Sequence, residues 1–165
     1  MKIDLSKKPK QIYDWTIERH IDNGKIKWNP NNFELFVSEK QKDSIRCTDL
    51  LKELEGRNVA NANLLDYLLD NPNLIPEEWK GKAIFFWGTI YCDRTGNLYV
   101  RYLCWDGGRW DWSDARWLGN DWNANDSALL LASTSNFDTK PYVLSPSTLE
   151  KLSKIEKLIK EIRNE

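Results

Sequence analysis

The hydrophobic pattern of the chain changes character near residue 83. Before this point, short groups of apolar residues alternate with charged and turn-forming residues. After it, aromatic and β-branched residues form longer runs, at 83–92, 98–105 and 109–113, and glycine-containing segments separate these runs. Apolar runs joined by such short turns are typical of β-hairpins. The sequence therefore predicts an antiparallel β-meander over about residues 83–113.

Residues 1–82 are predicted to be mainly helical, with one or two strands. The stretch 9–22 begins at a proline and ends before an Asn-Gly pair, which favours a short helix, although the same stretch also allows a strand. Over residues 33–38, alternating side chains predict a half-buried strand.

Two further helices are predicted from capping residues. Thr48 can cap a helix that ends at Gly56, and Asn61 or Asn63 can cap a second, leucine-rich helix. Residues 76–79 predict one additional turn, because proline suits the first position of a helix.

The chain after the meander predicts added strands and a final helix. Residues 128–132 form a buried-looking run, and residues 142–144 predict a short strand. Ser147 and Glu150 have the spacing of a capping box, which predicts the start of the last helix.

This last helix has an apolar stripe at spacings of three and four residues, formed by Leu152, Ile155, Ile159 and Ile162. The stripe predicts docking on the protein's own sheet. It also allows pairing with a partner helix or with a second copy of the chain, as in a short coiled coil.

Length and composition fit one domain. The chain has 165 residues, of which 41% are hydrophobic and 30% are charged. A chain of this size can bury a core of its own. We therefore predict a single α+β domain over residues 1–165, in which the meander and added strands pack against short N-terminal helices and a C-terminal amphipathic helix. Its parts are a mainly helical segment (1–82), a tryptophan-rich β region (83–144) and the C-terminal helix (145–165).

Charge and cysteine content narrow the functional classes. The formal net charge is −1, whereas a protein that binds duplex nucleic acid usually shows a clear basic excess. The three cysteines show no C-x-x-C spacing, and the sequence shows neither a leader peptide nor a membrane-spanning apolar run. We expect a cytoplasmic protein with reduced thiols, without a metal or other cofactor.

The most unusual feature of the sequence is the placement of tryptophan. Seven of the nine tryptophans lie between Trp79 and Trp122. Trp87, Trp105 and Trp110 are predicted to be core residues, because tryptophan buries a large area in a small domain.

The last three tryptophans of this region, at 112, 117 and 122, lie among short polar residues and resemble a recognition surface. Residues 105–126 are therefore predicted to contain a contact surface. The residues predicted to contact a partner are Arg109, Trp112, Asp114, Arg116, Trp117, Asn120, Asp121, Trp122, Asn123 and Asn125.

Three other readings of this segment stay open. The spacing of Asp121, Asn123 and Asn125 is that of a calcium loop, but the glycine and glutamate that such a loop needs are replaced by Asp126 and Ala132. Tryptophan faces can also stack on sugars. If the segment binds single-stranded nucleic acid, the tryptophan rings would stack on its bases. Its phosphates would then contact the arginines of the region, Arg94, Arg101, Arg109 and Arg116.

Catalytic patterns are sparse. The one histidine, His20, is far in sequence from any cysteine, and no phosphate-loop, dinucleotide-binding, metalloprotease or nucleophile-elbow motif occurs. Paired carboxylates at Asp111, Asp114 and Asp121 leave a small metal-assisted hydrolase or nuclease as the alternative.

Residues 61–69, 74–82, 85–91 and 100–103, together with the Trp-Asp-Gly-rich tract that follows, resemble a family of small tryptophan-rich proteins encoded by uncultured bacteria. This resemblance covers about residues 33–133 and implies no activity. The tract 108–114, with Trp122 and Asn123, is more weakly similar to ligand-binding tracts of C-type-lectin-like domains. The disulfides and calcium ligands of a classical lectin are absent from the sequence, so the resemblance implies only a binding surface.

Together, these observations predict a non-enzymatic binding module that presents a surface rich in Trp, Asn and Asp to a protein partner, for example as an inhibitor directed at a host or a phage protein. Trp105, Trp110 and Arg109 are expected to support this surface or to join it. Carbohydrate or single-stranded nucleic-acid binding stays open as a further alternative.

Overall fold

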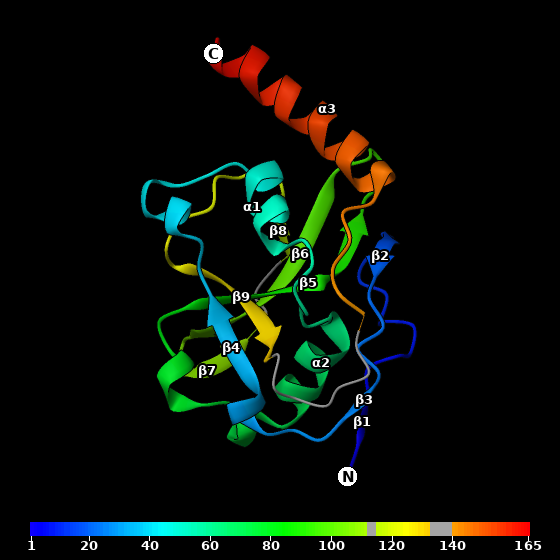
Figure 1. Ribbon diagram of the computed structural model, residues 1–165, viewed down its shortest axis with the longest axis vertical. Coiled ribbons are helices and arrows are strands. Elements are labelled where there is room, and N and C mark those ends of the chain that lie inside the picture. Colours follow the sequence, from blue (N-terminus) through cyan, green and yellow to red (C-terminus); the bar gives the residue numbers. More distant parts are fainter. Residues whose placement is uncertain (112–114, 133–139) are drawn as a thin grey trace.

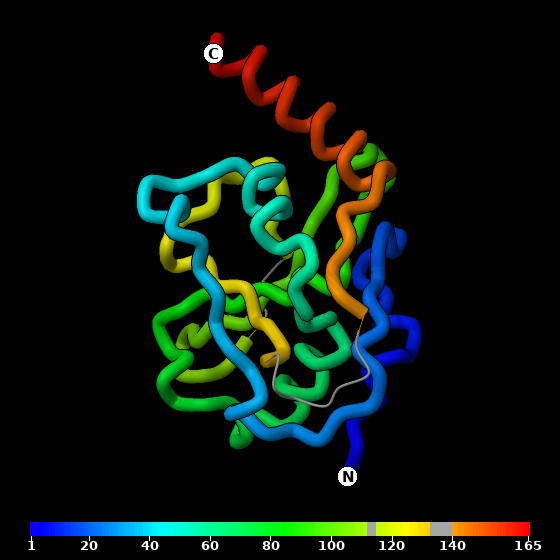
Figure 2. The backbone as a smooth tube through the Cα atoms, in the orientation of Figure 1, coloured from blue at the N-terminus to red at the C-terminus, as the bar shows by residue number. Residues whose placement is uncertain are grey.

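A computed structural model of the protein describes residues 1–111, 115–132 and 140–165. In this part of the chain, seven strands form the main sheet, and two short strands form a separate ladder. The helices and the sheet give the α+β fold that the sequence predicts. The two ends of the chain lie at opposite ends of the molecule (Figures 1 and 2).

The meander forms the centre of the main sheet. Strand β5 (Ala83–Cys92) pairs with β6 (Leu98–Asp106), and β6 pairs with β7 (Arg109–Asp111), all antiparallel. The prediction is confirmed as far as Asp111; residues 112–113 of the predicted run lie outside the described residues. A further strand, β8 (Ala115–Trp117), also pairs with β6.

Three strands extend this sheet on the other side of β5. Strand β9 (Asp126–Leu131) runs parallel to the first part of β5, and β4 (Phe33–Phe36) pairs antiparallel with β9. Strand β2 (Thr16–His20) pairs with the second part of β5. The separate ladder joins β1 (Ile3–Asp4) to β3 (Lys25–Ile26).

The helices cover both faces of the sheet (Figure 1). Helix α2 (Ala62–Asp70) packs on the face that carries Ile84, Phe86 and Leu103, whereas α1 (Cys47–Leu54) and α3 (Pro146–Arg163) pack on the face that carries Phe85 and Trp87. Neighbouring residues of β5 therefore point into different halves of the core. This explains why the strand is a continuous apolar run, because a strand buried on both faces has no polar side.

Short 3-10 helices complete the chain: η1 (Pro30–Asn32), η2 (Glu39–Asp43), η3 (Pro72–Leu74) and η4 (Glu77–Trp79). The last of these is the turn predicted at residues 76–79. The predicted cap of α2 is also confirmed, since the Asn61 side chain accepts a hydrogen bond from the backbone N–H of Asn63.

Other local predictions need correction. The stretch 9–22 is not a helix. Its second half forms strand β2, because its backbone pairs with the second part of β5. Residues 142–144 form no strand. Tyr142 is instead a buried anchor, whose backbone exchanges two hydrogen bonds of 2.8 Å with residues 56–57.

Two predicted helix caps are also wrong. Thr48 lies inside α1, and its hydroxyl donates to Glu156 of α3. Helix α3 begins at Pro146 and is capped by Ser145, because proline suits the first helical position. Ser147 donates instead to Glu18 of β2.

Helix α3 docks on the protein's own core, as the apolar stripe predicts. Leu152, Ile155 and Ile159 are buried beside α1, but Ile162 is 80% exposed. The stripe thus loses contact with the core in its last turn, where α3 extends past α1 (Figure 1). In the described residues, no helix is both long and apolar enough to cross a membrane.

Candidate functional site

The predicted contact segment contains a structural ion pair. Arg116 of β8 binds the buried carboxylate of Asp126, with 2.8 Å between Nη1 and Oδ1, and its Nη2 donates to the backbone oxygen of Asp121. The guanidinium lies 4.6 Å from the ring centroid of Trp122. Arg116 therefore holds the loop between β8 and β9 in place through hydrogen bonds from both of its terminal nitrogens.

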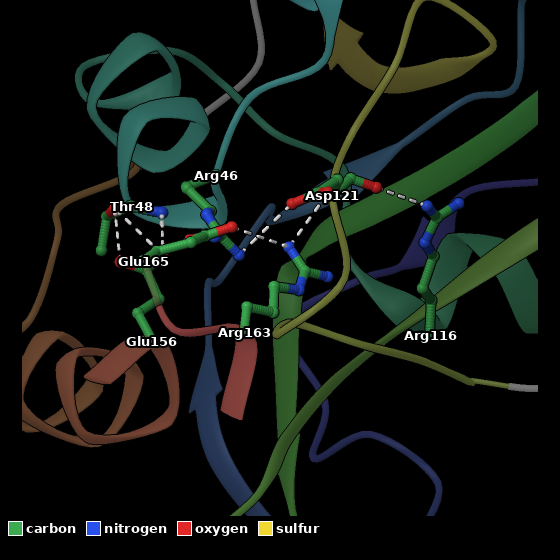
Figure 3. A network of polar contacts seen from close by, with 7 residues as sticks. All are labelled: Arg46, Thr48, Arg116, Asp121, Glu156, Arg163 and Glu165. Carbon is green, nitrogen blue, oxygen red and sulfur yellow. Dashed lines mark hydrogen bonds and ion pairs between the residues drawn. The ribbon is translucent and has the colours of Figure 1, made fainter. Parts of the chain in front are cut away.

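Asp121 is bound by two other arginines (Figure 3). Its carboxylate lies 3.4 Å from Arg46 at the start of α1 and 3.5 Å from Arg163 at the end of α3. Arg46 in turn binds Glu165 at 2.6 Å. This network joins α1, the β8–β9 loop and the end of α3. The predicted contact residue Asp121 therefore stabilises the packing of these three segments.

Trp122 is fully buried, so the prediction that it faces a partner is wrong. Its ring packs against Phe85 and Trp87, with centroids 4.8 Å from each. Trp117 is half-buried against the same core, and a Cβ atom on Gly119 would come within 2.5 Å of its ring.

The asparagines of this loop occur where the backbone forms turns. The Asn123 side chain accepts from the backbone N–H of Asn125, and its own backbone N–H donates to Asp126. Such side-chain bonds to nearby backbone are the usual role of Asn and Asp in turns. Asn120, Asn123 and Asn125 remain exposed, whereas Trp112 and Asp114 lie outside the described residues.

The hairpin of β6 and β7 carries the exposed aromatic surface instead. Trp105 is 37% exposed, against the prediction that it is core, and lies directly opposite half-buried Trp110 in the β6–β7 register. Their ring centroids are 5.4 Å apart in an edge-to-face arrangement, and the ammonium of Lys80 lies 3.8 Å from the Trp105 ring centroid. Arg109, also exposed, starts β7. We call Trp105, Trp110, Arg109 and Lys80 the hairpin tip.

A pocket of about 500 Å³ adjoins the hairpin tip. It lies between the second half of α2, strands β6 and β7, and the N-terminal segment, and it is lined by Lys10, Asp66, Leu69, Asp70, Arg101, Arg109, Trp110 and Asp111. Of these lining residues, only Arg109 was among the predicted contacts.

An ion pair forms the buried part of this pocket. The Arg101 side chain is 2% exposed and donates from Nη2 to Asp66 of α2 at 2.9 Å. Burial raises the pKa of neighbouring Tyr91, while the guanidinium of Arg101 opposes this rise. A buried guanidinium beside a carboxylate fixes the position of α2 over β6, because either charge alone would be costly to bury.

The side chains of the pocket are mostly charged. Its described lining offers carboxylates, guanidinium groups, one ammonium and an indole, and includes neither histidine nor cysteine. His20 and the buried cysteines Cys47 and Cys92 do not line it. Within the described part of the chain, no group of three or more His, Cys, Asp or Glu residues is arranged to hold a metal ion.

Each of the four arginines considered for phosphate contact is paired with an aspartate. The pairs are Arg94–Asp14 at 2.6 Å, Arg101–Asp66 at 2.9 Å, Arg109–Asp111 at 3.3 Å and Arg116–Asp126 at 2.8 Å. A nucleic-acid surface needs guanidinium groups that face phosphate; of the four, Arg94 and Arg109 are the exposed ones, with side chains 80% and 77% exposed.

The sequence did not indicate Asp66, and it indicated Arg101 only as a possible phosphate contact and not as half of a buried ion pair. The one local sign was a charged residue inside the apolar run Tyr99–Leu103, where both faces of the strand are expected to be buried. A comparison of the chain with known proteins found no matching family model, curated protein or solved structure. Function therefore has to be argued from the surface of the chain itself.

Proposed function

We propose that the protein is a non-enzymatic binding module that engages a protein partner through the hairpin tip and the adjoining pocket. The observation that carries this proposal is the exposed indole of Trp105, which the ring of Trp110 and the ammonium of Lys80 support from within the fold. Exposed tryptophan and arginine beside a pocket are the residues that most often dominate the affinity of protein interfaces.

Three described residues of the predicted surface support the fold. Arg116, Asp121 and Trp122 hold the β8–β9 loop, so the proposed contact area narrows within the predicted segment 105–126 to its first part, which contains Trp105, Arg109 and Trp110 of the hairpin tip. For the alternative of a metal-assisted hydrolase, Asp111 and Asp121 take part in different ion pairs, with Arg109 and with Arg46 and Arg163, and Asp114 lies outside the described residues.

The proposal can be tested without a known partner by selecting a random peptide library on the immobilised protein. We expect enriched peptides that lose at least about tenfold in affinity on Trp105→Ala, the order of magnitude of a hot-spot truncation. Arg109→Ala should weaken the same peptides.

Val37→Ala is the matched control, because Val37 has the same exposed fraction of 37% and lies away from the hairpin tip. Peptides that bind Trp105→Ala as well as they bind the wild type, or the absence of any enrichment, would contradict the proposal.

A further inference from the structure

A second aromatic cluster lies at the other end of β6. Trp15 stacks on Tyr99, with centroids 4.1 Å apart and planes 20° from parallel, and Tyr13 lies 4.9 Å from Trp15. We call these three rings the aromatic row. Its outer ring, Tyr13, is 62% exposed.

The inner end of the aromatic row is held firmly. The Tyr99 hydroxyl donates to Asp93 at 3.2 Å, and Asp93 also accepts from Thr95 and Asn97 in the turn between β5 and β6. Burial favours a higher pKa for Asp93, but these hydrogen bonds outweigh it and lower the pKa. The hydrogen-bonded turn that contains the charged Asp93 therefore fixes the orientation of the aromatic row through Tyr99.

The backbone of Tyr13 is strained. Its φ is +50°, a conformation that a bulky side chain adopts at an energetic cost. Strain of this kind persists where a particular side-chain placement is needed, often at ligand sites. The ring of Tyr13 is nevertheless mostly exposed. The strained backbone is therefore not explained by burial of this ring in the core.

A pocket of about 460 Å³ opens beside the row, lined by Tyr13, Asp14, Trp15, Tyr99 and Ala115. This volume lies within the range of about 300–1,000 Å³ that is usual for small-ligand sites. The Asp14 carboxylate is paired with Arg94 at 2.6 Å, so the rim offers hydrogen-bond acceptors without a large excess of charge.

We propose that the aromatic row is a carbohydrate-binding site that takes a neutral pyranose. The apolar C–H face of the sugar packs on the exposed ring of Tyr13, beside the half-buried ring of Trp15, and its hydroxyl groups donate to Asp14. A nucleotide fits this site less well, since its phosphate would approach the Asp14 carboxylate and Arg94 is already paired. The site is separate from the hairpin tip and does not depend on the protein-binding proposal.

The test is a calorimetric titration of the whole protein with cellohexaose, chitohexaose and maltohexaose, and with a thymidine oligonucleotide of similar length. We expect saturable binding of at least one hexasaccharide in the millimolar range or below. Tyr13→Gly should weaken it at least about tenfold, a loss of about 1.4 kcal/mol. Trp105→Ala, at the hairpin tip, should leave it unchanged.

Tyr13→Gly also separates a ligand-binding role from a packing role, because glycine adopts a positive φ without strain. Its melting temperature should equal or exceed that of the wild type. No binding of any hexasaccharide, tighter binding of the oligonucleotide, full retention of sugar binding in Tyr13→Gly, or a lowered melting temperature of this variant would each overturn the proposal.

Discussion

The imidazole Nδ1 of His20 lies 2.9 Å from the hydroxyl oxygen of Thr89. The same hydroxyl accepts a hydrogen bond from the backbone N–H of Ala62, at the start of α2. The pair therefore joins β2, β5 and α2 at one point. Burial lowers the pKa of His20 from its ordinary value of 6.5, although the backbone oxygens of Leu5 and Lys7 and the charge of Asp22 act in the opposite direction.

Stability is expected to fall as the pH drops below about 6.5. The unfolded chain takes up a proton on its histidine near pH 6.5, whereas folded His20 does so only at a lower pH. The stabilising contribution is thus complete above pH 6.5 and is lost as the pH falls through the folded pKa. Urea unfolding midpoints between pH 7.5 and 5.0 measure this loss.

The matched variant for this prediction is His20→Gln, which does not titrate but can accept the Thr89 hydrogen bond. Its midpoint should change less across the same pH interval. Equal pH dependence in the two proteins would contradict the assignment to His20. Asp93, whose pKa is also lowered, contributes below its ordinary value of 3.8 and so does not interfere.

Gly88→Ala is expected to destabilise the protein by about 2–3 kcal/mol, the cost of overpacking a close contact. A Cβ atom at Gly88 would lie 2.9 Å from the backbone oxygen of Ala60 and from the Cα of Asn61. The backbone there also donates to Ala60 and accepts from Ile21, so displacement weakens both bonds. Chemical denaturation measures the change.

The comparison variant is Gly81→Ala, where no atom lies within 4 Å of the added Cβ and only the positive φ is unfavourable. It should cost about 1–2 kcal/mol. A smaller loss at residue 88 than at residue 81 would show that α2 can move away from β5.

Asp126→Ala is expected to cost about 3–5 kcal/mol, because it leaves the Arg116 charge without its buried partner. Asp111→Ala removes the carboxylate beside Arg109, whose side chain is 77% exposed, and should cost less than about 1 kcal/mol. Unfolding free energies of the two variants give a direct comparison. Similar losses would contradict the structural role of the Arg116–Asp126 pair.

Alanine substitutions at the two ends of the apolar stripe in α3 should differ in how much stability they remove. Ile155→Ala removes a side chain that is 5% exposed and is expected to cost about 2–4 kcal/mol, whereas Ile162→Ala should cost less than about 0.5 kcal/mol. If the stripe also pairs two copies of the chain, sedimentation should show a dimer that Ile162→Glu dissociates. A wild-type monomer at all concentrations would exclude this pairing.

The meander and the cap of α2 were predictable because their signals are local. Glycine-containing turns separate β5 from β6 and β6 from β7, and Asn61 stands shortly before the leucines of α2 in the sequence. Strand β2 was ambiguous for the opposite reason, since its hydrogen-bond partner lies in β5, some seventy residues away. The residues of β2 itself, with Ile17 as the one apolar side chain among five, do not show the alternation that marks a strand.

The candidate site was predictable only in part. Trp122 stands among Asp and Asn residues that form turns, and these resembled a recognition surface although the ring is buried in the core. The Arg101–Asp66 pair joins a strand and a helix that are 35 positions apart in sequence. The sequence alone does not show which two charged residues, this far apart, form an ion pair in the folded protein.

The pairing of each surface arginine of the β region with its own aspartate has a kinetic consequence. Long-range attraction between proteins arises from unbalanced patches of charge, and it can raise association rate constants from about 10⁵–10⁶ to 10⁸–10⁹ M⁻¹s⁻¹ at low salt. Arg94 and Arg109 are neutralised beside both proposed contact areas. Encounters at these areas should therefore proceed at the slower rate set by diffusion and orientation, with little dependence on ionic strength.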